Sequence, residues 1–248
     1  MPKLFSTAYF PPVSYFAAMA QEMGGLVLRH NTEQESLTGT ENNTANRQES
    51  APELSSSVVY IEACENFQKQ SYRNRCYFYG ADGVQSLQVP ILHEGGTHKQ
   101  AISEIKIDWS KPWLLQHKRA IISAYRTSAY FEYYQDELFE ILDSQPERLF
   151  DLNLAIIRFF IEKTGLAIDL NKTEDYSRDG KVGSNGINCE DLRETIHPKR
   201  QNTILESLDL KKPYFQVFAQ KHGFQSDLSI MDLLFNEGPE SILYIKKL

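Results

Sequence analysis

The residues best suited to chemistry lie in the segment 65–75, which reads ENFQKQSYRNR. It places Lys69, Arg73 and Arg75 within seven residues of one another. An arginine binds phosphate or carboxylate through two parallel hydrogen bonds, and a lysine adds a point charge. Arg119, further along the chain, is a candidate second ligand for the same anion. We therefore expect a site for an anionic small molecule, and the alternative is a solvated turn between two strands.

Neutral polar side chains accompany these cations. Gln70 and Asn74 lie among them and carry planar amides, which donate and accept hydrogen bonds in fixed directions. We expect them, together with Tyr9, to orient the sugar or acyl part of the ligand. Tyr125 is a further candidate substrate-binding residue.

Two residues are candidates for acid and base catalysis. Glu65 opens the basic segment, directly after an apolar run, and a buried glutamate must be paired or protonated. It is a candidate general base, or else the partner of a nearby arginine. His117 shares a helix face with Trp113, four residues earlier. It is the second candidate, and the alternative is a histidine of the core.

A second basic group, TIHPKR, occupies residues 195–200. A histidine followed by two cations in a loop is compatible with a lid over an anionic ligand. It is equally compatible with an exposed basic loop. The sequence leaves both interpretations open.

Cofactor signatures are absent from the sequence. The three cysteines form no CxxC pair, so we predict no metal site. There is no Walker loop, no GxGxxG and no GxSxG motif. The cofactor therefore stays open, with ATP and Mg²⁺ as one candidate.

The composition excludes several classes of protein. The 248 residues carry a formal net charge of −7, which is unlike a general nucleic-acid binder or a polybasic membrane-surface protein. No apolar run approaches eighteen residues, and the N-terminus lacks the apolar core of a signal peptide. Few cysteines, odd in number, suit a reducing compartment. We expect a cytoplasmic globular protein whose oligomeric state the sequence does not reveal.

The pattern of elements predicts an α/β fold. The run VVYIEAC at 58–64 is almost continuously apolar, as in a parallel strand that is buried on both faces. From residue 112 the chain becomes helical. We expect a mostly parallel central sheet from the N-terminal half, with a helical C-terminal half packed on it. Strands are expected over 3–10, 58–64, 75–80, 86–92, 166–170 and, at an edge, 102–107; helices are expected over 13–23, 113–125, 130–142 and 149–164.

One segment differs from the rest in composition. Residues 31–57 are rich in Asn, Thr, Glu, Ser and Gln and contain almost nothing apolar. Such a segment cannot offset its ordering entropy by burial. We expect a disordered surface insertion within a single domain that spans 1–248.

Six motifs, taken in order, resemble the WbqC-like protein family, in the compact form of Bacteroidetes-type bacteria. They are YFPPVSYF, IEACENFQKQSYRNRC, LQVPI, WLLQHKRAIISAYRTSAYFEYY, LFDLN and DLSIMDLLFNEGPE. The resemblance implies a role in bacterial surface-polysaccharide biosynthesis, with amide-forming modification of amino sugars as one activity. Many members begin with a motif that has a histidine and a glycine, where this chain has Phe5 and Ser14.

A fainter likeness links the opening strand, Pro-rich turn and helix to nucleotidyltransferase-like ligases such as pantothenate synthetase. It bears on fold alone, because the histidines of those ligases have no counterpart here. We therefore predict a cytoplasmic transferase or ligase that acts on an anionic, nucleotide-linked amino sugar. The alternative is a non-catalytic binding or scaffold protein whose arginines and amides form a structural network.

Overall fold

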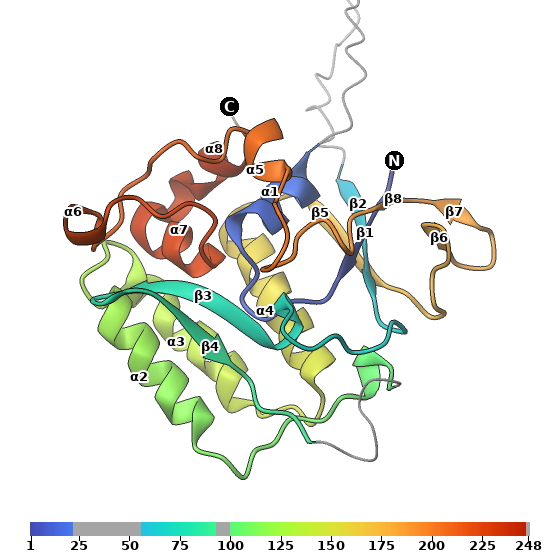
Figure 1. Cartoon of the computed structure of the whole chain (residues 1–248), viewed down its shortest axis with the longest axis horizontal. Coiled ribbons are helices and arrows are strands. Elements are labelled where there is room, and N and C mark those ends of the chain that lie inside the picture. Colours follow the sequence, from blue (N-terminus) through green and yellow to red (C-terminus); the bar gives the residue numbers. More distant parts are fainter. Residues whose placement is uncertain (22–55, 93–99, 247–248) are drawn as a thin grey trace, which may run out of the picture.

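A parallel sheet lies at the centre of the computed structural model, which describes residues 1–21, 56–92 and 100–246 (Figure 1). Its strand order is β5-β2-β1-β8. The strands are β1 (Lys3–Ser6), β2 (Ser57–Glu62), β5 (Ile168–Lys172) and β8 (Glu190–Asp191). All three pairings are parallel. The prediction of an α/β fold with a parallel sheet is therefore confirmed.

The origin of the strands differs from the prediction in one respect. Both β5 and β8 come from the C-terminal half of the chain, and they add the two outer strands. The short β8 pairs with Lys3 and Leu4 of β1. Its two residues, Glu190 and Asp191, are polar, so no apolar pattern marked them as a strand.

A separate antiparallel hairpin follows β2 along the chain. It consists of β3 (Arg75–Gly80) and β4 (Gly83–Gln88). The predicted strand at 75–80 is confirmed. The strand predicted at 86–92 instead begins at Gly83 and ends at Gln88, before Pro90, which has no N–H for a sheet ladder.

The edge strand predicted at 102–107 is wrong. Ile102–Glu104 form a short 3-10 helix, η3. The backbone N–H groups of Ile102 and Ser103 donate to the carbonyls of Glu65 and Ala63, so the loop after β2 satisfies them. The alternating apolar residues that suggested a strand are buried here without a ladder.

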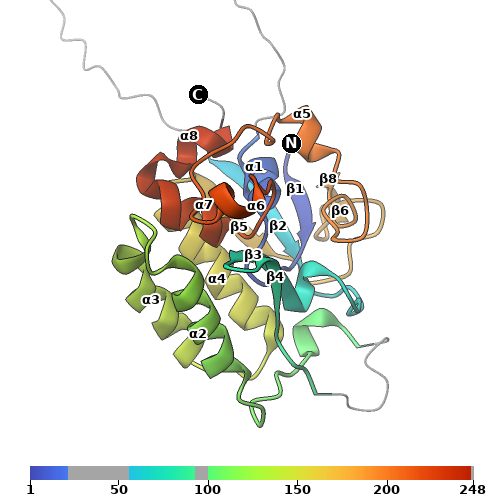
Figure 2. The ribbon, with the colours of Figure 1, turned by 60° about the vertical axis from the view of Figure 1, so that its left-hand side comes forward.

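The major helices pack around these two sheets. They are α1 (Val13–Ala20), α2 (Trp113–Tyr125), α3 (Phe131–Asp143), α4 (Leu149–Lys163), α7 (Ile230–Glu237) and α8 (Ser241–Lys246). Figure 2 shows α2, α3 and α4 side by side, with α4 on the side toward the sheet. The predicted helices from residue 112 onward are confirmed. None of the helices in the described part of the chain has the length and apolarity that a membrane crossing requires.

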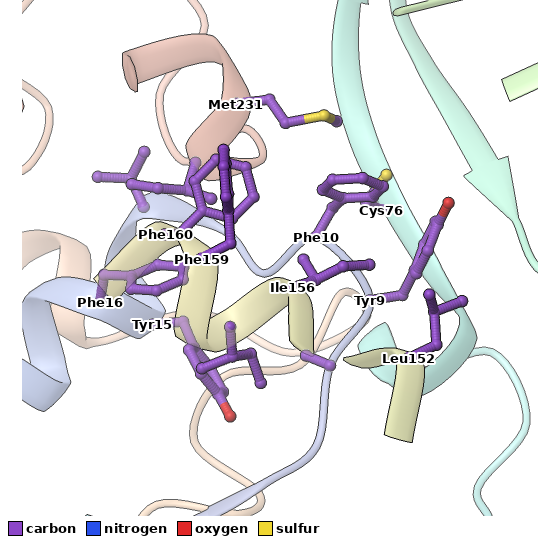
Figure 3. Packing of buried hydrophobic residues seen from close by; sticks show 14 of the residues in the cluster. Tyr9, Phe10, Tyr15, Phe16, Cys76, Leu152, Ile156, Phe159, Phe160 and Met231 are labelled. Carbon is purple, nitrogen blue, oxygen red and sulfur yellow. The ribbon is translucent and has the colours of Figure 1, made fainter. Parts of the chain in front are cut away.

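Aromatic side chains from distant segments join these elements (Figure 3). Phe10 and Phe16 each lie with their ring centroids 6.1 Å from that of Phe160 on α4. All three side chains are fully buried. Edge-to-face pairs at such spacings stabilise a core beyond the area they bury. The core thus fixes the Pro-rich turn after β1 against α4.

Two predicted segments extend beyond the residues that the structure describes. The predicted insertion at 31–57 lies outside the described residues, except for Ser56 and Ser57. Ser57 is the first residue of β2. The predicted helix at 13–23 is described as far as Gln21, and its helical part ends at Ala20.

Candidate anion-binding site

A cavity of about 350 Å³ opens where the hairpin meets the segment after β2. Four predicted site residues line it, namely Lys69, Gln70, Asn74 and Arg75. The remaining lining residues are Phe67, Gln88, Pro90, Ile91 and Lys111. Among the residues that the structure describes, the lining thus combines three cations and three amides with an apolar wall, and none of these residues carries a carboxylate.

A single turn of 3-10 helix, η1 (Tyr72–Asn74), connects the basic segment to β3. Ser71 caps it by accepting a hydrogen bond from the N–H of Arg73, and its hydroxyl donates to the carbonyl of Gln68. Asn74 is bound on two sides to Val89: its Nδ2 donates to the Val89 carbonyl at 3.0 Å, and its own carbonyl accepts from the Val89 N–H at 2.8 Å. These bonds fix the chain where β3 begins.

The hairpin register places Arg75 directly across from Gln88. The guanidinium Nη2 of Arg75 donates to Oε1 of Gln88 at 3.1 Å. A neutral amide does not balance the positive charge of Arg75, and no carboxylate among the described residues pairs with it. A phosphate is a stronger acceptor for a guanidinium than an amide is, because its bonds are charge-assisted.

The other two lining cations have different surroundings. Lys69 has no hydrogen-bond or ion-pair partner within the described ranges 1–21, 56–92 and 100–246. Lys111 lies 3.2 Å from a carboxylate oxygen of Asp108. Hydrogen bonds from Ser110, and then the ammonium of Lys111, lower the pKa of Asp108. Only one of the three lining cations is therefore balanced by a carboxylate among the described residues.

Arg73 lies outside the lining and forms a buried ion pair with Glu65 instead. Its Nε donates to Oε1 of Glu65 at 2.9 Å and its Nη2 to Oε2 at 2.7 Å. Nη2 also donates to the hydroxyl of Ser6 at 2.7 Å. Arg73 is 2% exposed and Glu65 6%. Burial raises the pKa of Glu65, and the hydrogen bonds and charge of Arg73 oppose this rise.

A second arginine network lies beside this pair, at the carboxyl ends of β1 and β2. Glu62 is fully buried and accepts hydrogen bonds from Thr173, Ser177 and Arg193. Arg193 binds Asp191 with two further hydrogen bonds. Arg193 was not a predicted site residue, because its partner Glu62 lies more than a hundred residues earlier in the chain.

His117 and Tyr9 lie in the core rather than in the lining. The hydroxyl of Tyr9 and Nδ1 of His117 are joined by a 2.9 Å hydrogen bond. The ring of His117 also packs edge-on against Trp113, with centroids 4.9 Å apart. Burial lowers the pKa of His117 to about 4, so the imidazole is neutral at physiological pH.

The last two candidates also lie apart from the cavity lining. Tyr125 is buried at the end of α2, where its hydroxyl accepts a hydrogen bond from the N–H of Tyr79 at 3.4 Å. Arg119 is exposed on α2. The structure thus brings four of the ten candidates into one lining, pairs two more beside it, and places four elsewhere.

Sequence reasoning missed Lys111 and Gln88 as lining residues. Gln88 could have been found only from the register of the hairpin, and Lys111 only from the position of the loop before α2. No group of three or more His, Cys, Asp or Glu side chains suited to a metal ion occurs within the described residues.

Comparisons with known proteins identify the family. No solved structure matches this chain. The uncharacterized protein Rv1507c of Mycobacterium tuberculosis (strain ATCC 25618 / H37Rv) is 27% identical over 204 residues, which cover 76% of this chain and 87% of that protein. The family model described as the WbqC-like protein family matches residues 54–244, well over half of the chain. The chain therefore belongs to the WbqC-like protein family.

Proposed function

We propose that this protein binds an anionic, nucleotide-linked sugar in the cavity and acts on it as a transferase or ligase in surface-polysaccharide biosynthesis. One observation carries the proposal: Lys69, Arg75 and Lys111 line a cavity to which none of the described residues contributes a carboxylate. Its volume of about 350 Å³ lies within the usual range for small-molecule sites. Phosphate groups are the anions that such a combination of lysine and arginine suits best.

The neutral part of the lining suits the rest of such a ligand. Phe67, Pro90 and Ile91 offer an apolar wall for a base or a sugar ring, and Gln70 and Gln88 offer amides for hydroxyl and amide groups. In this proposal the cations stabilise negative charge on the phosphates and the amides orient the reacting group. Both effects accelerate transfer reactions without a general base in the lining.

ATP with Mg²⁺ is the co-substrate to test for the ligase activity. Mg²⁺ is commonly held by one or two carboxylates together with substrate phosphates. The described lining residues include no carboxylate, so they do not fit a resident Mg²⁺ ion. Any Mg²⁺ would arrive bound to the phosphates of the nucleotide.

Melting temperatures with candidate ligands test the proposal. We would screen UDP-sugars, dTDP-sugars, ATP and coenzyme A, each at about 1 mM with and without Mg²⁺. A site with a Kd near 0.1 mM gains about 1.4 kcal/mol of stability at this concentration, which raises the Tm by about 3–6 °C. We expect a nucleotide sugar to give this shift and Arg75→Ala to abolish it.

Arg158→Ala is the matched control, because Arg158 is exposed on α4, outside the lining. It removes the same charge and should keep the full shift. Absence of a shift with every ligand would contradict the proposal. Incubation of the binding nucleotide sugar with ATP or coenzyme A esters, followed by mass spectrometry, then tests for the transferred group.

The scaffold interpretation remains a second candidate, supported by a different observation. Ser6, Glu65 and Arg73 satisfy one another in a buried network that ties the end of β1 to the segment after β2. Such a network can serve architecture alone. The scaffold interpretation predicts that Arg75→Ala and Arg158→Ala give the same result in every binding assay.

A further inference from the structure

The loop 192–200 lies against the basic segment, although well over a hundred residues separate the two in sequence. Three contacts hold the loop in place, one with Ser6 of β1 and two with the basic segment. The hydroxyl of Ser6 donates to the carbonyl of Arg193 at 3.2 Å, and the amide of Gln68 donates to Glu194 at 2.9 Å. The ammonium of Lys199 contacts Oε1 of Gln70. The third contact matters most here, because Gln70 lines the cavity.

Lys199 has a weak partner in this arrangement. Within the described ranges its ammonium contacts only the neutral amide oxygen of Gln70, and no carboxylate pairs with it. An ammonium that binds a neutral amide gains less than one that binds an anion. The ammonium of Lys199 therefore lies at the edge of the cavity, where it can bind a phosphate oxygen.

Gln70 is held in an unusual conformation at the same place. Its φ is +60°, in the left-handed region that non-glycine residues rarely adopt. Such conformations persist where surrounding contacts impose them, and they gather at ligand sites. The side chain of Gln70 contacts Lys199, and Gln70 also lines the cavity.

The loop itself is held in shape near Lys199. The N–H of Lys199 donates to Nδ1 of His197 at 3.2 Å, and Arg200 pairs with Glu194 at 2.8 Å. The charge of Arg200 is thus balanced within the loop, whereas the charge of Lys199 is not. Lys199 therefore differs from Arg200, whose charge Glu194 balances.

We propose that Lys199 is a fourth cation of the anion site and that it selects a diphosphate over a monophosphate. The inference rests on the proposed function. Lys69, Arg75 and Lys199 leave three positive charges without a carboxylate partner among the described residues. A diphosphate matches this charge better than a single phosphate does, and it is longer, so it can contact the lining cations and Lys199 together.

Affinities for inorganic pyrophosphate and inorganic phosphate test the inference. We would measure both by calorimetry on the full chain at constant ionic strength. The wild type should bind pyrophosphate at least about tenfold more tightly than phosphate, since one more charge-assisted contact forms. Lys199→Ala should lose about tenfold in pyrophosphate affinity and change phosphate affinity less than about twofold.

Two variants make the result specific. Lys181→Ala removes an exposed lysine on the two-residue strand β6 (Lys181–Val182), away from the lining, and should leave both affinities unchanged. Arg75→Ala should weaken both ligands. If Lys199→Ala behaves like Lys181→Ala while Arg75→Ala still weakens binding, the proposed function stands and the role of Lys199 is refuted. If the wild type binds neither anion, both are refuted.

Discussion

Replacing Arg73 by methionine leaves the carboxylate of Glu65 buried without its cation. The change removes two hydrogen bonds to the carboxylate, at 2.9 and 2.7 Å. Hydrogen bonds to charged groups contribute about 1.5–3 kcal/mol each. Breaking a buried ion pair from one side costs about 3–5 kcal/mol. We therefore expect Arg73→Met to lower the free energy of unfolding by about 4 kcal/mol, and the Tm by roughly 8–16 °C.

Urea denaturation at several pH values measures this loss. Protonation of Glu65 removes the unpaired charge, and burial already raises the pKa of this carboxyl. The loss in Arg73→Met should therefore be smaller at pH 5 than at pH 8. The double variant Glu65→Met with Arg73→Met should recover most of the stability, because neither charge remains buried.

Arg75→Met is the control for this experiment. Arg75 lines the cavity and binds only a neutral amide among the described residues, so its replacement should change stability by less than about 1 kcal/mol. A loss below about 1 kcal/mol in Arg73→Met would refute the reasoning. So would a double variant no more stable than the single one.

Two further predictions concern stability. Burial raises the pKa of Asp232 from 3.8 to about 6, so its favourable contribution is present below about pH 4 and lost as the pH rises to 6. Asp232→Asn copies the neutral form, and its stability relative to the wild type should rise by about 2 kcal/mol between pH 4 and 7 in urea denaturation; a constant difference would contradict this. A Cβ on Gly238 would come within 2.5 Å of the Tyr130 ring at a φ of +55°. Gly238→Ala should therefore lower the free energy of unfolding by more than about 2 kcal/mol. Gly183→Ala is the control, because φ is +71° there and no atom lies within 4 Å of the added Cβ, and it should cost about 1 kcal/mol. Equal losses of Tm in the two variants would contradict the contact with Tyr130.

Local patterns in the sequence were sufficient for the class of fold and for the segment that carries the site. The apolar run of β2 predicted a parallel strand, and β2 pairs in parallel with both β1 and β5. The helical periodicity of α2, α3 and α4 likewise determined their ends to within one or two residues. The density of cations and amides in 65–75 also predicted the site, since four of these cations and amides line the cavity.

Alternation of apolar residues was misleading at 102–107. Both a strand and a 3-10 turn can bury every second or third residue there, and the local pattern does not distinguish them. The neighbouring loop decided the outcome by accepting the backbone hydrogen bonds of Ile102 and Ser103. That loop is set by the fold of β2, forty residues earlier in the chain.

Tertiary structure alone decided the role of each charged residue. Arg73 and Arg75 are the same residue type, two positions apart, yet one pairs with buried Glu65 and the other lines the cavity. His117 became a core histidine because Tyr9, distant in sequence, lies beside it. A side chain's type determines which partners it can bind. Which partner it does bind depends on segments that only the folded chain brings together.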